Sequence, residues 1–252
     1  MNDLQILPIR LEEDIQPGDD LTELLAQALY KRALSLRDED VLVVCHKIIS
    51  KAEGKIVALE GVRPSALAKS WAARFDRDAR LIEVVLSQAR RIVRMEEGLV
   101  IAETIHGFVA ANCGVDTSNA PPDCAVLLPS APDVSAKRLA EGLGRRFGCR
   151  LSCIVSDTFG RPWRMGLLEV AIGVWGFAPL IDLRGEPDRA GREMRSSIVA
   201  LADQAAAAAG LVMKKDAGIP AVLIRGLELP GPRRNNRSGK DLLRPAGQDL
   251  FR

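Results

Sequence analysis

The sequence has few aromatic residues, few histidines and almost no excess of charge, and these shortages exclude several classes of function. Aromatic side chains make up 4% of the 252 residues, and the formal net charge is +2, which argues neither for nor against an acidic partner. With only His46 and His106, a histidine-rich metal centre is excluded, so any metal must be bound by oxygen. No apolar stretch is long enough to span a bilayer, and the charged start of the chain is no signal peptide. We therefore expect a cytoplasmic protein without a membrane partner.

The cysteines argue against both disulfides and zinc. There are five of them, an odd number, and no Cys-x-x-Cys pair occurs. Some lie within or beside apolar runs, which is typical of buried free thiols in a reducing compartment. Two nucleotide-binding signatures are also missing, because the chain has neither a Gly-x-x-x-x-Gly-Lys-Ser/Thr motif nor a Gly-x-Gly-x-x-Gly motif.

What is present is an alternation of apolar runs with amphipathic segments, which predicts a mixed fold of helices and strands. Strands are expected at 41–45, 99–102, 107–111, 125–128, 151–155, 169–174 and 221–224. Helices are expected at 20–36, at 64–89 in two pieces, at 135–147 and at 196–213. Asp20-Leu21-Thr22-Glu23 reads as a capping box, so the acidic turn Pro17–Asp20 is expected to start a helix and not to bind a ligand.

Two polar clusters follow apolar runs and carry most of the chemical information. The first is Asn112–Asn119 and the second is Ser156–Arg164. Each places an aspartate beside hydroxyl and glycine residues at the predicted end of a strand, and a carboxylate next to a hydroxyl suits a hard divalent cation that shares phosphate ligands. The arginines of the second cluster add phosphate-binding chemistry. The alternative is that both clusters are turns closed by Asp and Ser side chains. Two such clusters in one chain favour a phosphate-and-metal site.

Two basic features have competing interpretations. Lys51 follows a predicted strand, where its ammonium either contacts a nucleotide phosphate or is a solvated surface charge. The tail at 233–240 is rich in arginine but has no interleaved aromatics, so it is expected to be solvated and mobile. We therefore expect no nucleic-acid partner.

Several segments in order along the chain closely resemble the coenzyme F-420:L-glutamate ligase family. The matching segments are 41–54, 106–119, 156–164, 169–173, 211–213, 219–226 and 243–252. The resemblance implies a GTP-dependent peptide ligase that acts on the deazaflavin precursor of coenzyme F-420. GTP would phosphorylate the terminal carboxylate of the precursor, and the amine of L-glutamate would attack the acyl phosphate, with later additions γ-linked. It also implies Mg²⁺ or Mn²⁺, help from K⁺, and a homodimer.

The resemblance assigns roles to particular positions but names no catalytic side chain. The residues that match metal ligands are Asp116, Asp157 and Thr158, with Asp216 as a candidate for a second metal. The residues that match nucleotide contacts are Glu12, Glu13, Asp14, Ile15, His46, Lys51 and Asn119. The sequence departs from the family pattern at His46, at Met165 and at Lys214-Lys215-Asp216. At the last site two interpretations stay open: Asp216 substitutes for the usual ligand, or Lys215 replaces part of the charge of the second metal.

The fold implied by the resemblance is α+β, a two-lobed mixed α/β architecture with largely antiparallel sheets, and homodimeric. We expect residues 1–95 with 210–252 to form a discontinuous nucleotide-binding lobe, and 96–209 to form a metal- and substrate-binding lobe. Two other functions remain: an amino-acid ligase for a different cofactor acid, and a catalytically silent protein that binds F-420 or a guanine nucleotide.

Overall fold

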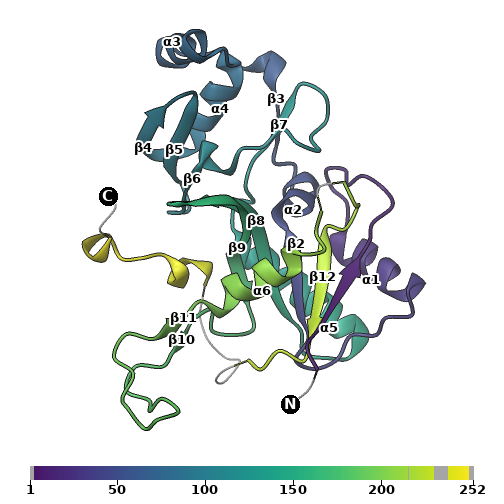
Figure 1. Ribbon diagram of the computed structural model, residues 1–252. Helices are drawn as coiled ribbons and strands as arrows, with labels where there is room; N and C mark the ends of the chain where they lie inside the picture. Colours follow the sequence, from purple (N-terminus) through teal and green to yellow (C-terminus); the bar gives the residue numbers. More distant parts are fainter. Residues whose placement is uncertain (1–2, 215, 230–237, 250–252) are drawn as a thin grey trace.

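A five-stranded sheet forms the centre of the protein (Figure 1). The computed structural model describes residues 3–214, 216–229 and 238–249. The strand order is β1-β12-β2-β8-β9, in which β2 and β8 are parallel and every other neighbouring pair is antiparallel. The strands are β1 (Gln5–Ile9), β12 (Ala221–Arg225), β2 (Val41–Cys45), β8 (Ser152–Arg161) and β9 (Arg164–Trp175).

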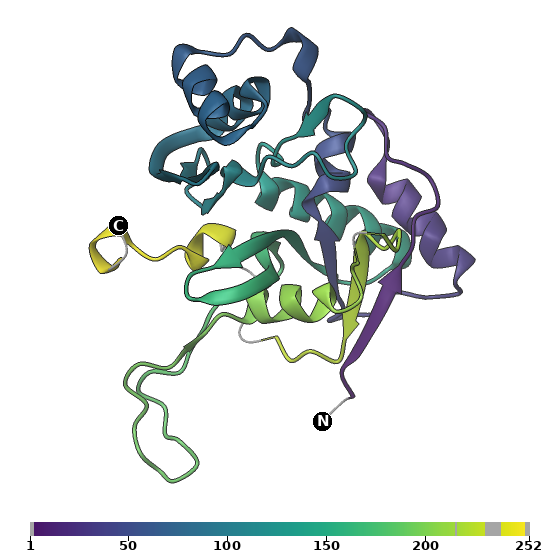
Figure 2. The same cartoon turned by 45° about the horizontal axis from the view of Figure 1, so that its top comes forward.

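Helices cover both faces of this sheet, which explains why its central strands are apolar without interruption. Leu42 and Val44 of β2 face a core shared with α1, α2 and α5, whereas Val41 and Val43 face a second core shared with α6. Figure 2 shows the sheet between these layers. The helices are α1 (Leu21–Lys31), α2 (His46–Ala52), α5 (Pro132–Phe147) and α6 (Leu201–Gly210). The Asp20 carboxylate caps α1 by accepting the N–H groups of Thr22 and Glu23, a contact that contributes about 1 kcal/mol.

A second group of elements packs around its own apolar cluster, which contains Val85, Val100 and Ala125 (Figure 1). Its helices are α3 (Ala66–Phe75) and α4 (Ala79–Gln88). Its strands are β4 (Ala89–Glu96), β5 (Leu99–Thr104) and β6 (Val109–Ala111), which form one antiparallel sheet, and β3 (Ile56–Ala58) and β7 (Cys124–Val126), which form another.

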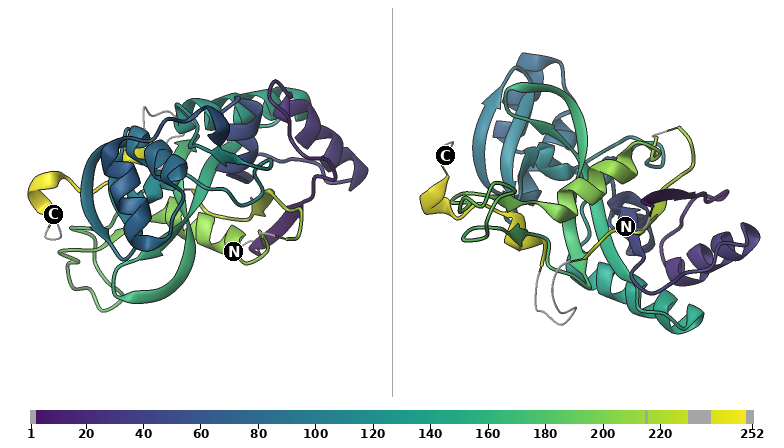
Figure 3. Two further views of the ribbon diagram at one scale, coloured as in Figure 1. Left: turned by 90° about the horizontal axis from the view of Figure 1, so that it is seen from above. Right: turned by 60° about the horizontal axis from the view of Figure 1, so that its bottom comes forward.

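The remaining elements project from the centre. The short strands β10 (Ile181–Asp182) and β11 (Ile198–Val199) pair at the base of an arm, and Figure 3 shows this arm on the same side as the C-terminal segment. Single 3₁₀ turns occupy Leu59–Gly61, Asn112–Gly114, Gly239–Leu242 and Ala246–Gln248. The C-terminal segment is held to the sheet by Asp133, whose Oδ1 accepts the N–H groups of Val174 and Gly239 at 2.8 Å each.

The mixed α and β composition and the mostly antiparallel sheets confirm that part of the predicted fold. Several predicted elements differ from the structure. The segment after β2, for which no helix is predicted, is helix α2. The predicted helix at 196–213 begins only at Leu201, because Ile198 and Val199 pair with β10. The strand predicted to stop before Asp157 continues to Arg161, because β9 pairs with its whole length.

The predicted division into lobes stays a prediction, and the central sheet takes strands from both of the predicted lobes. Most of the basic tail at 233–240 lies outside the described residues. Within the described part of the chain, no helix combines the length and the apolar character required to cross a membrane.

Candidate functional site

The topology of the central sheet brings distant parts of the sequence to one edge. Ile9, Ala221, Val44 and Val155 stand side by side in neighbouring strands. Strands β1, β2 and β8 run in one direction; β1 and β2 end at or just beyond this row, β12 begins there, and β8 continues past it with β9 alone. The segments at 10–15, 46–51 and 213–220 are attached to these strand ends, Asp157 and Thr158 lie on β8 just beyond the row, and Asn119 comes from the loop between β6 and β7. The carboxyl ends of strands are a common place for ligand sites in α/β proteins.

A pocket of about 330 Å³ lies at this edge. The predicted site residues that line it are Glu13, Asp14, Ile15, Lys51, Asn119, Asp157, Thr158 and Asp216. Of the remaining three, Glu12 lines an adjoining pocket of about 530 Å³ that shares the 13–15 segment. His46 and Asp116 lie behind the wall of the first pocket, where each contacts a residue that lines it.

Asp157 and Thr158 lie within β8 and contact each other. The backbone N–H of Thr158 donates to Asp157 Oδ1 at 2.7 Å. The Thr158 hydroxyl donates to Glu169 Oε1 of β9 at 2.5 Å. Two carboxylates and a hydroxyl are therefore held together on one wall of the pocket, and all of them offer oxygen.

The side chain of His46 is completely buried, so it reaches the site only from behind. Its Nε2 lies 3.2 Å from Asp157 Oδ1, although the angle is not that of a hydrogen bond. Its Nδ1 lies 3.3 Å from the hydroxyl of Ser50, which is also fully buried. In this structure the His46 ring supports Asp157 and does not open onto the pocket.

Lys47 links α2 to the loop that carries Asp116. Its ammonium is 2.6 Å from Asp116 Oδ2 and donates to the Ser118 hydroxyl at 2.6 Å. The Ser118 N–H donates to Asp116 Oδ1, also at 2.6 Å. Burial opposes ionisation of Asp116, but the bonds from Lys47 and Ser118 outweigh burial and lower the pKa of this carboxyl. Asp116 is therefore ionised at neutral pH and is bound to a cation of the chain itself.

Lys51 is buried along its stem, with 9% of its side chain exposed, yet its ion-pair partner is almost fully solvated. The partner is Asp14, whose carboxylate lies 3.7 Å away and is 89% exposed. Such a pair contributes little to stability. The positive charge of the Lys51 ammonium is therefore only weakly neutralised by Asp14. An ammonium in this state at the wall of a pocket is well placed to bind an anion.

The remaining wall comes from the segment before β12. Lys214, Asp216 and Gly218 line the pocket, and Gly218 O accepts the N–H of Leu11 at 3.1 Å, which ties this segment to the one after β1. Lys215, the other residue of the predicted departure, lies outside the described residues.

Cys45 also lines the pocket but is no nucleophile. Burial, with smaller effects from the negative charges of Glu169 and Asp157, raises the pKa of its thiol to about 12. The thiol stays protonated at neutral pH, which excludes catalysis by a thiolate here.

The donor set fits a hard cation only in part. Among the described residues, no group of three or more His, Cys, Asp or Glu side chains is arranged to hold a metal ion by itself. The oxygens of Asp157, Thr158 and Asp216 nevertheless share the pocket with the ammonium groups of Lys47, Lys51 and Lys214. This chemistry suits Mg²⁺ or Mn²⁺ whose coordination is completed by the phosphates of a substrate.

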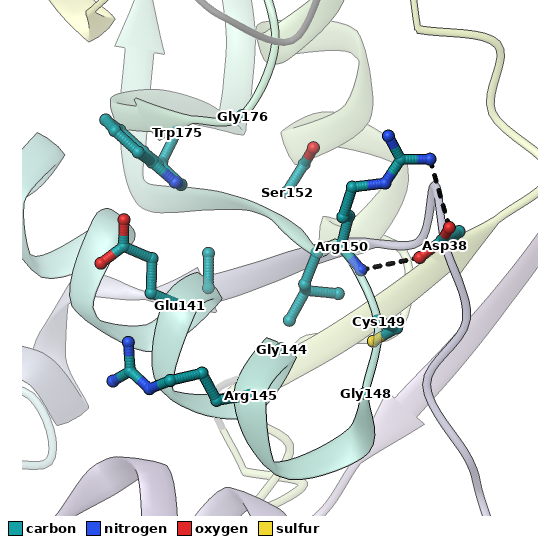
Figure 4. A pocket seen from close by; sticks show the side chains of 12 residues that line it. Asp38, Glu141, Gly144, Arg145, Gly148, Cys149, Arg150, Ser152, Trp175 and Gly176 are labelled. Carbon is teal, nitrogen blue, oxygen red and sulfur yellow. Dashed lines mark hydrogen bonds and ion pairs between the residues drawn. The ribbon is translucent and has the colours of Figure 1, made fainter.

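A larger pocket of about 560 Å³ lies at the opposite edge of the sheet, where β8 begins and β9 ends. Figure 4 shows Trp175, Glu141 and Arg145 around it, and Arg150 bound to Asp38. The backbone N–H of Arg150 donates to Asp38 Oδ1 at 2.7 Å, and Nη2 donates to Oδ2 at 3.2 Å. None of the predicted site residues lines this pocket, so the smaller pocket is the candidate site.

Two residues of the site were not singled out from the sequence. Lys47 stands next to His46 within the 41–54 segment that resembles the family, and Glu169 begins a predicted strand. The signal for Glu169 is its position opposite Thr158 across the β8–β9 hairpin, since polar residues paired across strands contact one another. No local signal identifies Lys47, because its partner is 69 positions away in the loop of Asp116.

Comparison with known proteins gives a consistent result over nearly the whole chain. The profile of the family described as F420-0:Gamma-glutamyl ligase matches residues 9–226. The coenzyme F420:L-glutamate ligase of Methanopyrus kandleri is 43% identical over 255 residues, covering 99% of this chain and 98% of that protein. The enzymes of the same name from Methanothermobacter thermautotrophicus and Haloarcula marismortui are 43% and 32% identical, covering 93% and 99% of this chain and 93% and 96% of their own.

Proposed function

The chain belongs to the F420-0:gamma-glutamyl ligase family, and on this premise we propose that it is a GTP- and divalent-metal-dependent coenzyme F420:L-glutamate ligase. Its substrates are GTP, L-glutamate and the unglutamylated deazaflavin precursor. The observation that carries the proposal is the pocket at the strand ends, where oxygen donors and three lysine side chains meet.

The reaction has two steps. The terminal carboxylate of the precursor takes the γ-phosphoryl group of GTP, which gives an acyl phosphate and GDP. The amine of L-glutamate then attacks the acyl carbon, inorganic phosphate leaves, and an amide forms with loss of a proton from the amine. The amide product carries a new carboxylate, so further γ-linked glutamates are added by the same chemistry.

The side chains have separate tasks in this proposal. Asp157 and Asp116 would hold one Mg²⁺ or Mn²⁺, and Thr158 and Asp216 would hold a second. When bound, such cations would supply positive charge that neutralises the phosphates. Lys51 binds a phosphate oxygen, and K⁺ adds further positive charge. The support for these assignments is the set of oxygen donors from Asp157, Thr158 and Asp216 in the pocket lining, and the weakly neutralised charge of Lys51.

The nucleotide contacts proposed for 12–15 and Asn119 are supported by their places around the two adjoining pockets. Glu12, Glu13 and Asp14 carry negative charge, so their contacts to GTP run through backbone groups or through the base and not through phosphate. The proposed contact at His46 also uses its backbone, because its ring is buried.

Mass spectrometry tests the proposal directly. The purified protein is incubated with GTP, Mn²⁺, L-glutamate and the unglutamylated coenzyme, with and without K⁺. A product heavier by one glutamyl residue, formed only with nucleotide and metal, is the expected result. Nucleotide binding without any product would indicate a silent binding protein instead. Turnover of a different acid under the same conditions would indicate a ligase for another cofactor.

We also propose that the working unit is a homodimer. The tip of the β8–β9 hairpin supports this, because Trp163, Met165 and Leu167 are 79%, 97% and 61% exposed. Burial of such side chains against a second copy would remove apolar surface from water. Light scattering at micromolar concentration tests the dimer, and a stable monomer would contradict it without affecting the ligase proposal.

A further inference from the structure

Glu169 is the one carboxylate of the pocket to which neither the resemblance nor the proposed reaction gives a role. It stands opposite Thr158 in the register between β8 and β9. Gly210, near the end of α6, packs against its stem, and a Cβ at Gly210 would lie 2.8 Å from Glu169 Cγ. The fold therefore leaves space for this side chain and fixes its direction.

Both oxygens of Glu169 accept hydroxyl protons from the neighbouring strand. The Ser156 hydroxyl donates to Oε2 at 2.8 Å, and the Thr158 hydroxyl donates to Oε1 at 2.5 Å. A hydroxyl has one proton and two lone pairs. Once Glu169 accepts the proton of the Thr158 hydroxyl, the Thr158 hydroxyl oxygen can offer only its lone pairs to a ligand.

Thr158 is fixed at a second point, since its backbone N–H is bound to Asp157 Oδ1. A hydroxyl that is free to rotate would spend part of its time with the proton directed at a bound cation, which repels it. A neighbouring carboxylate that orients a ligand in this way also increases the basicity of the ligand.

We infer that Glu169 is a positioning residue that holds the Thr158 hydroxyl as an acceptor-only ligand for a divalent cation. This rests on the proposed function, in which Thr158 binds the metal. Each oxygen of Glu169 accepts one hydroxyl proton, from Ser156 or from Thr158, and these two bonds direct the carboxylate at the neighbouring strand.

The substitution Glu169→Gln tests the inference with little change in shape. Glutamine has one acceptor oxygen and an NH₂ donor, so it accepts only one of the two hydroxyl protons. The affinity of the full-length protein for Mn²⁺ is measured by calorimetry in the presence of GDP. We expect Glu169→Gln to weaken Mn²⁺ binding about tenfold or more, the range for outer ligands of metal sites. Thr158→Val should weaken it at least as much, and Thr158→Ser should retain it.

The double variant Glu169→Gln/Thr158→Val separates positioning from direct binding. If Glu169 acts through Thr158, the double variant binds Mn²⁺ no more weakly than Thr158→Val alone. Additive losses would overturn the inference, because Glu169 would then act on its own. The matched control is Ser156→Ala, which removes the other hydroxyl partner and should leave Mn²⁺ affinity within about twofold of the wild type. Thermal unfolding of each variant shows that the fold is retained.

The results also distinguish this inference from the proposed function. Unchanged affinity in Glu169→Gln, with weakened binding in Thr158→Val and normal Mn²⁺ binding by the wild type, overturns the inference alone. Unchanged affinity in Thr158→Val overturns the inference and also removes Thr158 from the proposed metal ligands. If the wild type binds no Mn²⁺ with GDP, both the inference and the metal-dependent ligase proposal are wrong.

Discussion

Two carboxylates of this protein are paired with basic side chains near opposite edges of the central sheet, and the two pairs are built differently. Asp40, just before β2, is 1% exposed and accepts Arg225 Nε at 2.9 Å and Nη2 at 2.7 Å. Asp116, in the loop beside the candidate site, accepts a single ammonium from Lys47 at 2.6 Å.

The difference follows from the chemistry of the two cations. The planar guanidinium of Arg225 matches both oxygens of Asp40 and also donates to Ser35 O at 2.7 Å, so it joins three segments at the end of the sheet where β2 begins and β12 ends. The ammonium of Lys47 is a point charge on a flexible stem, and it contacts Asp116 Oδ2 and the Ser118 hydroxyl without the planar match of a guanidinium. We therefore expect the Asp40–Arg225 pair to stabilise the fold, and the Asp116–Lys47 pair to hold the Asp116 carboxylate in place beside the candidate site.

The largest expected effect comes from breaking the structural pair. Asp40→Asn leaves the guanidinium of Arg225, 14% exposed, without its anion. Loss of one partner of a buried pair costs about 3–5 kcal/mol in the free energy of unfolding. Urea denaturation measures the loss. The control is Asp38→Asn, whose partner Arg150 is 72% exposed, and we expect it to cost less than about 1 kcal/mol. Equal losses in the two variants would contradict the structural role of Asp40.

At the site the same exchange of Asp for Asn should act on turnover. Asp157→Asn keeps an oxygen to accept the Thr158 N–H but removes the negative charge. We expect the rate of glutamyl-product formation to fall about 100-fold or more, equivalent to roughly 2.7 kcal/mol of transition-state stabilisation. The free energy of unfolding should change by less than about 1 kcal/mol. Normal turnover at ordinary Mg²⁺ would remove Asp157 from the site.

Lys51 should have a smaller effect, on binding alone. Lys51→Met keeps the buried stem and removes the charge, and we expect GDP binding in the presence of Mn²⁺ to weaken by about 1.5–3 kcal/mol. Lys137→Met is the control, because Lys137 lines neither of the two adjoining pockets and forms an exposed ion pair with Glu141 in which the side chains are 47% and 44% exposed. That variant should change affinity by less than about 0.5 kcal/mol. If calorimetry gives the two variants equal affinities, Lys51 does not contact phosphate.

Much of the central sheet and of the placement of the candidate site could be predicted from the sequence, although neither ion pair could. The apolar runs at 41–45 and 221–224 predict buried strands, and the structure confirms both. The hydrophobic period and the Asp20 cap predict α1, although it ends at Lys31 and not at 36. The predicted site segments do meet at one edge, since eight of the eleven predicted residues line a single pocket.

What could not be predicted depends on contacts between distant segments. A polar stretch such as His46–Ala52 gives no helical pattern, and α2 is stabilised by packing of Ile48 and Ile49 in the core below the sheet edge. The continuation of β8 through Asp157 needs β9 as its partner. The pairing of Lys47 with Asp116 depends on the path of the loop at 112–123, which the local sequence does not determine.

The smallest expected effect concerns the charge that Lys47 supplies to Asp116. In the wild type the pKa of Asp116 is lowered from its ordinary value of 3.8, because the bonds from Lys47 and Ser118 outweigh the opposing effect of burial. A lowered pKa means that the ionised carboxyl stabilises the fold above the unfolded value, and that this contribution is lost as the pH falls through the folded value. In Lys47→Met the effect of burial is opposed only by the Ser118 donors, so the pKa of Asp116 should rise and the loss of stability should begin at higher pH.

NMR titration of the Asp116 carboxyl carbon in the wild type and in Lys47→Met measures the shift, and urea denaturation across the acid range measures its consequence. Ser118→Ala keeps the backbone N–H and should leave the pKa lowered. An Asp116 that titrates identically with and without Lys47 would show that the short contact between them does not govern this carboxyl, and the contrast with Asp40 and Arg225 would then rest on geometry alone.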